Sequence, residues 1–68
     1  MIIEKLKKLS RESKNEIVSN WALHLAEEFE QEYEYLGCGD EVLFDIAVDR
    51  LIHEASDSVA KTIINFIK

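Results

Sequence analysis

The chain has 68 residues, no proline, one cysteine and a formal net charge of −6 at neutral pH. A domain of this length buries only about 60% of the surface that its unfolded chain exposes, and one cysteine excludes an internal disulfide, so we expect a second copy to supply the missing stability. The negative charge argues against direct nucleic-acid binding, and no apolar run approaches the roughly eighteen residues of a membrane-spanning helix, so we expect a cytoplasmic protein without membrane contact.

The first expected element is a short amphipathic helix over residues 2–9, which carries isoleucine and leucine on one face. Residues 10–15 are polar and compete for backbone hydrogen bonds, which favours a break. Ser13 and Glu16 stand at the spacing of a capping box just before an apolar run, so we place the start of the second helix at Ser13. A cap at Ser10 and one continuous helix are the alternatives.

The second helix is predicted over residues 17–36, where apolar positions recur at three- and four-residue steps for about five turns. Glutamates and a glutamine occupy the opposite face, so this helix is expected to bury one side only. The apolar stripe consists of Val18, Trp21, Ala22, Leu25, Ala26, Phe29, Tyr33 and Leu36.

The chain's two glycines flank Cys38 in a short link over residues 37–40. Gly37 suits the left-handed residue that commonly ends a helix, and Asp40 suits the N-cap of the next helix. Such a link between two helix-patterned segments predicts an antiparallel helical hairpin. A redox role for Cys38 is not favoured, because nearby carboxylates disfavour the thiolate.

The C-terminal arm is apolar over most of its circumference. Its apolar positions recur every four residues, a step that drifts around a helix, so the arm is expected to break near Ser56 into helices at about 41–55 and 58–67. One long helix is the alternative. A helix this apolar must be covered on more than one side, which predicts a homodimer. The expected interface consists of Val42, Ile46, Val59, Ile63, Ile64, Phe66 and Ile67.

These elements predict an all-α fold with one domain over residues 1–68. We expect an antiparallel helical hairpin with a short N-terminal helix and a broken C-terminal arm, completed as a bundle by dimerisation. Residues 1–14 hold five basic and two acidic side chains, whereas residues 15–57 hold twelve acidic and one basic. In a hairpin that turns at Gly37, the acids would gather at the turn and the bases at the open end, across which the N-terminal helix would pack.

Groups that could carry chemistry are few. The serines stand at caps or on polar faces without a spaced base, and no phosphate-binding glycine loop is present, so we expect neither an enzyme nor a cofactor. A metal-binding bundle is the alternative. His24 and Glu28 stand four residues apart, as do Asp49 and His53, and the hairpin register would place the two pairs level.

The acidic run before the link is the sharpest surface feature. Complementary charge steers encounters and selects partners, and an aromatic side chain away from the core stripe can anchor such a contact. The expected partner-binding residues are Glu27, Glu28, Glu30, Glu34 and Tyr35. We therefore predict a non-enzymatic regulator or inhibitor that presents an acidic surface to a basic protein partner. Nucleic-acid mimicry is a sharper variant, and a purely structural subunit is the third interpretation.

Overall fold

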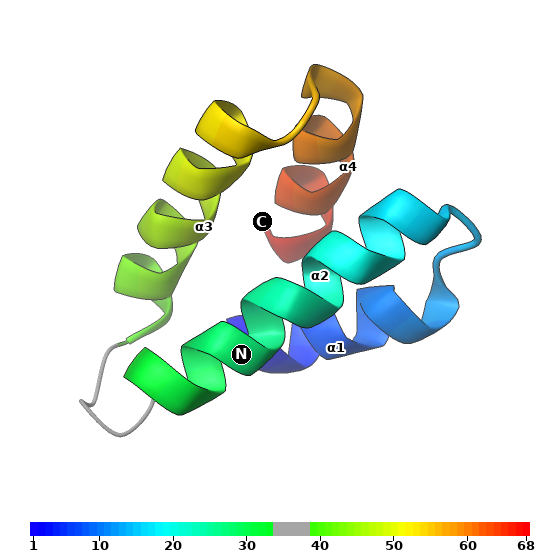
Figure 1. Ribbon diagram of the computed structural model, residues 1–68. Helices are drawn as coiled ribbons and strands as arrows, with labels where there is room; N and C mark the ends of the chain where they lie inside the picture. The colour runs from blue at the N-terminus through cyan, green and yellow to red at the C-terminus, as the bar shows by residue number, and fades with distance from the viewer. Residues whose placement is uncertain (34–38) are drawn as a thin grey trace.

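The chain is all-α in the computed structural model, which describes residues 1–33 and 39–68. These residues form four α-helices and one π-helical segment, and no strand. The predicted class is therefore confirmed for the described ranges. The elements are α1 (Ile2–Glu12), α2 (Glu16–Glu28), the π-helix η1 (Phe29–Tyr33), α3 (Asp40–Glu54) and α4 (Asp57–Ile67), shown in Figure 1. None of these helices combines the length and apolarity that crossing a bilayer requires.

Helices α1 and α2 run antiparallel and lie side by side (Figure 1). The link between them positions α2 through Asn15, whose side-chain oxygen accepts hydrogen bonds from the backbone N–H groups of Ile17 at 2.9 Å and Val18 at 3.2 Å. The predicted capping box is therefore wrong by two residues. Ser13 lies in the link, where its hydroxyl oxygen accepts from the Asn15 N–H at 3.1 Å.

The predicted long second helix changes character near its end. After Glu28 the helix continues as the π-helix η1, a rare form with wider hydrogen-bonded turns. Phe29 is fully buried in this segment, and Tyr33 packs edge-to-face against it with ring centroids 5.8 Å apart. This aromatic pair fixes η1 on the core. Residues 34–38, which include the end of the predicted second helix and Gly37 and Cys38 of the predicted link, lie outside the described residues, so the expectations placed there stay predictions.

The predicted break in the C-terminal arm is confirmed. Helix α3 ends at Glu54 and α4 begins at Asp57, within one residue of the expected bounds. Ser56 is the N-cap of α4, and its hydroxyl oxygen accepts from the Val59 N–H at 3.4 Å. The prediction for the start of α3 is corrected: Gly39 is its N-cap, while the Asp40 carboxylate accepts from the Ile2 N–H of α1 at 3.3 Å.

The core draws apolar side chains from all four α-helices and from η1, and it contains no buried polar residue among those described. Helix α4 lies against each of the other three α-helices. The described members of the stripe predicted for the second helix are buried as expected, with Trp21 and Tyr33 partly covered at its edges, and Leu36 lies outside the described residues. The buried residues are Ile2, Ile3, Leu6, Leu9, Val18, Ala22, Leu25, Ala26, Phe29, Leu43, Ala47, Leu51, Val59, Ala60, Ile63 and Ile67.

The expected separation of charge along the hairpin does not form. Because α1 runs back along α2, Lys7 of α1 reaches η1, where its ammonium lies 2.8 Å from the Glu30 carboxylate. The contact between Ile2 and Asp40 likewise brings the start of α1 to the start of α3. The prediction that α1 packs across the open end is therefore wrong.

Candidate functional site

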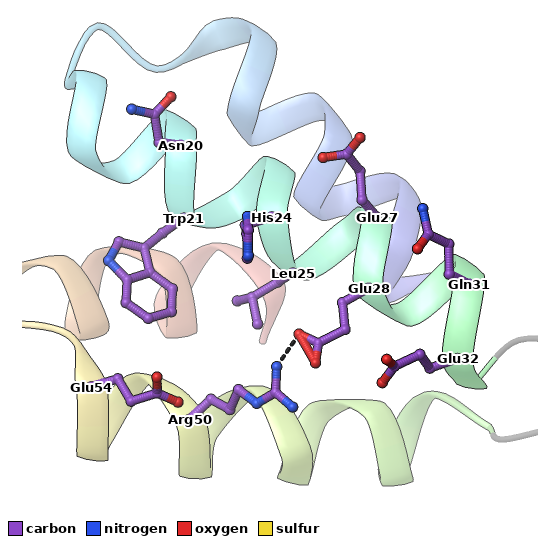
Figure 2. A pocket seen from close by; sticks show the side chains of 10 residues that line it. All are labelled: Asn20, Trp21, His24, Leu25, Glu27, Glu28, Gln31, Glu32, Arg50 and Glu54. Carbon is purple, nitrogen blue, oxygen red and sulfur yellow. Dashed lines mark hydrogen bonds and ion pairs between the residues drawn. The ribbon is translucent and has the colours of Figure 1, made fainter.

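A groove runs between α2 with η1 on one side and α3 on the other (Figure 2). Its volume is about 750 Å³. The α2 and η1 wall is a stripe whose members recur at three- and four-residue steps, and α3 supplies two residues one turn apart. The lining residues are Asn20, Trp21, His24, Leu25, Glu27, Glu28, Gln31, Glu32, Arg50 and Glu54.

Glu28 and Arg50 form an ion pair across the groove (Figure 2). The two side chains are 20% and 31% exposed, so the pair is only partly screened by water. The hydrogen bond to Glu28 raises the pKa of Arg50 above its ordinary value, and burial, which lowers this pKa, only partly offsets the effect. Arg50 is therefore a permanent cation held by the facing helix.

The remaining carboxylates of the groove are exposed. Glu27 and Glu32 come from the α2 and η1 wall, and Glu54 comes from the α3 wall. No ion pair to these three is recorded within residues 1–33 and 39–68. With Arg50 already balanced by Glu28, the groove carries a surplus of negative charge along both walls.

Trp21 gives the groove an apolar surface. This side chain, the only tryptophan of the chain, is half-buried, packs against the core and lines the groove. In Figure 2 its indole points toward α3, on the side where Glu54 lies. Leu25, one turn further along α2, is buried beneath the groove. A partly exposed indole flanked by carboxylates suits a ligand that is both apolar and cationic.

The predicted acidic surface is only partly brought together. Glu27 and Glu28 line the groove, although Glu28 is occupied by Arg50. Glu30 turns away from the groove and pairs with Lys7 of α1. The other two expected members, Glu34 and Tyr35, lie outside the described residues.

The sequence interpretation did not assign several members of this site, among them Glu32, Arg50, Glu54 and Trp21. Glu54 is far from the acidic run in sequence, but a hairpin that turns near residue 38 places residue 54 level with residue 22, so the register could have identified it. Trp21 was assigned to the core stripe. The exposed fraction of Trp21 depends on the separation between α2 and α3. Helical periodicity carries no information about this separation.

The four candidate metal ligands do not converge. His24 lines the groove, where Glu28 is bound by Arg50. Asp49 and His53 lie 3.3 Å apart on α3, more than two-thirds exposed. No group of three or more potential metal-binding side chains is found in the part of the chain that the structure describes. The expected facing of two histidine and carboxylate pairs is therefore not formed.

The seven expected dimer-interface residues fall into three groups. Val59, Ile63 and Ile67 are buried in the chain's own core, so they are covered without a second copy. Ile46 and Ile64 are half-buried and pack against that core. The exposed members are Val42 at 48% and Phe66 at 37%. Dimerisation itself stays a prediction.

No family model matches the sequence, and comparison with curated proteins and with solved structures found no match. A functional proposal therefore depends on the geometry and charge of the groove.

Proposed function

We propose that this chain is a non-enzymatic interaction module whose acidic groove binds a basic surface of a partner protein. The observation that carries the proposal is the lining of the groove between α2 with η1 and α3: four glutamates and one arginine, with that arginine already paired to Glu28. Carboxylates on two facing walls reinforce one another's potential, so they attract lysine and arginine side chains and increase the rate of encounter.

The proposed surface is narrower than the whole acidic run. Glu28 and Glu30 each bind a basic side chain of another helix, so their main contribution is to the fold. Glu27, Glu32 and Glu54 are exposed and lie around the groove, which leaves them available for a partner. A small module of this kind would act as a regulator or inhibitor by occupying a basic surface. If that surface normally holds nucleic acid, the module would compete with it.

Capture of the partner tests the proposal. The immobilised chain is exposed to native extract, and bound proteins are released with increasing salt and identified. Replacing Glu27, Glu32 and Glu54 with glutamine removes three charges and preserves side-chain size and helix propensity. We expect the wild-type chain to retain a basic protein that salt releases, because charge pairs at an exposed interface are screened by ions, and we expect the triple variant to lose it.

A matched control removes the same number of charges elsewhere. Glu12, Asp45 and Asp49 are exposed and do not line the groove, so their amides change the net charge equally. The control variant should retain the partner. Equal retention by the groove and control variants, or capture that salt does not affect, would contradict the proposal.

Self-association remains part of the proposal for the quaternary structure. It is supported by the small size of the chain and by three exposed apolar side chains on α3 and α4, namely Val42, Ile52 and Phe66. These residues do not line the groove, so a dimer built on them would leave it open to a partner.

A further inference from the structure

The shape of the groove restricts what can occupy it. Its α2 and η1 wall follows one face from Asn20 to Glu32, in steps that return to the same side of the helix. A helix rises about 1.5 Å per residue, so this wall extends for about 18 Å, or about three turns. The α3 wall, with Arg50 and Glu54, faces it across the groove (Figure 2). The site is therefore a trough between two helices, suited to an elongated ligand.

The chemistry of the trough has two parts. Its apolar part is the partly exposed indole of Trp21, with the buried Leu25 beneath the groove, and its charged part consists of exposed carboxylates on both walls. An amphipathic helix presents an apolar face with side chains at three- and four-residue steps, and cations at the edges of that face can reach either wall. A basic helix of about three turns thus satisfies the apolar and the acidic parts together.

The pair between Glu28 and Arg50 determines where cations of the occupant can bind. It neutralises the middle of the trough, and Figure 2 shows Glu54 at the end where Trp21 lies and Glu32 toward the other end. Cationic side chains should therefore bind at two places about two to three turns apart. Beside Glu54, the indole of Trp21 can also contact the stem or the charged head of a lysine or arginine.

We infer that the trough between α2 with η1 and α3 is the binding site for a basic amphipathic helix of the partner protein, with Trp21 as its apolar anchor and Glu32 and Glu54 as its charge contacts. This inference rests on the proposed function and specifies the chemistry of the partner. Trp21 fits the anchor role because large aromatic side chains in a partly covered position dominate many interfaces.

The fluorescence of Trp21 tests the inference directly, because the chain has no other tryptophan. The probe is a synthetic helical peptide of leucine and lysine, with leucine at three- and four-residue steps on one face. A second peptide has the same residues reordered so that leucine is spread around the helix. We expect saturable change in fluorescence with the first peptide at low salt and markedly weaker binding of the second, because only the first presents an apolar face to Trp21.

Single variants then assign the charge contacts. Glu32→Gln and Glu54→Gln should each weaken binding of the amphipathic peptide about twofold to fivefold, the range for one exposed charge pair. Asp49→Asn removes one exposed charge on the outer side of α3 and should leave the affinity unchanged. Circular dichroism of each variant confirms that its helix content is retained.

Equal binding of the two peptides, equal weakening by Asp49→Asn, or no saturable fluorescence change would overturn the inference. These failures differ from a failure of the proposed function. If capture of a basic partner is lost in the triple glutamine variant while the amphipathic peptide does not bind, the acidic surface is the site but its ligand is not a helix. If the groove variant retains its partner as the control variant does, the proposed function itself is contradicted.

Discussion

Glu28 at the end of α2 and Arg50 in α3 form an ion pair that joins two helices across an otherwise open groove. The carboxylate and the guanidinium are both partly withdrawn from water, and each is the other's principal partner. The pair therefore bridges the two walls of the groove, in addition to the core contacts that α3 makes through Leu43, Ala47 and Leu51.

Replacing Arg50 with alanine is expected to destabilise the chain by about 1–3 kcal/mol, because Glu28 would remain partly buried without its hydrogen-bond donor. In a domain of this size, that corresponds to a fall in Tm of about 4 °C or more. Thermal unfolding followed by circular dichroism measures the change. The control is Lys8→Gln, which breaks an exposed i, i+4 pair worth only about 0.3–0.5 kcal/mol. Equal losses from both variants would mean that the pair across the groove is no stronger than a surface pair.

The same pair predicts a pH profile. Hydrogen bonding to Glu28 raises the pKa of Arg50, so the stability from its charge is fully present below the unfolded pKa of arginine and is lost only as the pH rises through the still higher folded pKa, in the strongly alkaline range. Arg50→Lys moves this loss to about pH 10.4, where lysine titrates. We expect the difference in unfolding free energy between wild type and Arg50→Lys to be constant from pH 7 to 9 and to grow from about pH 10 to 11. Urea unfolding at each pH measures it, and a constant difference throughout would show that charge at position 50 contributes nothing.

Helical periodicity predicted most of the fold because it reports which side of each helix is apolar. The stripe of α2, the buried face of α1 and the break at Ser56 all follow from local spacing and local capping chemistry. The packing position of α1 could not be predicted from local spacing, because an amphipathic helix can bury its apolar face against any of several neighbouring helices. Its position along α2 is determined by the packing of the whole core. The ion pair between Lys7 and Glu30 forms as a result of that position.

Only those site residues that lie close together in the sequence could be predicted from it. The acidic run indicated Glu27 and Glu28, but the pairing of Glu28 with Arg50 joins positions 22 residues apart and determines which acids remain exposed. The wide apolar surface of the C-terminal arm predicted a dimer interface, because sequence spacing does not show which apolar residues the chain covers with its own helices. In the folded chain, a large part of that excess lies in its own core, as Ile63 shows.

Asn15 is expected to contribute more to the stability of α2 than the serine predicted to cap it. Its side chain accepts two backbone hydrogen bonds at the start of the helix, whereas Ser13 accepts one within the preceding link. Asn15→Ala should therefore reduce the unfolding free energy by about 1 kcal/mol, the usual effect of removing an N-cap. Chemical denaturation of both alanine variants measures the difference. A larger loss from Ser13→Ala would place the functional cap at the serine.

Ile63 tests whether α4 belongs to the core of one chain. The side chain is fully buried, so Ile63→Ala should cost about 2–5 kcal/mol through lost burial and a cavity. A core residue makes this contribution within each chain, so the loss should be the same at every protein concentration, whereas an interface residue would show a concentration-dependent loss. Thermal unfolding at several concentrations distinguishes the two. A loss that changes with concentration would return Ile63 to the expected dimer interface.

Two of the seven expected interface residues, Val42 and Phe66, are exposed, so self-association is expected to depend on them. Both are exposed, so glutamine at the two positions should change the stability of a single chain only slightly while weakening a contact between copies. We expect wild type to show a concentration-dependent rise in sedimentation coefficient and the double variant to show it only at higher concentration. Ile17→Gln is the control, because Ile17 is more exposed than either residue but lies at the start of α2. Sedimentation as a monomer at all concentrations would contradict the dimer. An equal effect of Ile17→Gln would place the contact elsewhere.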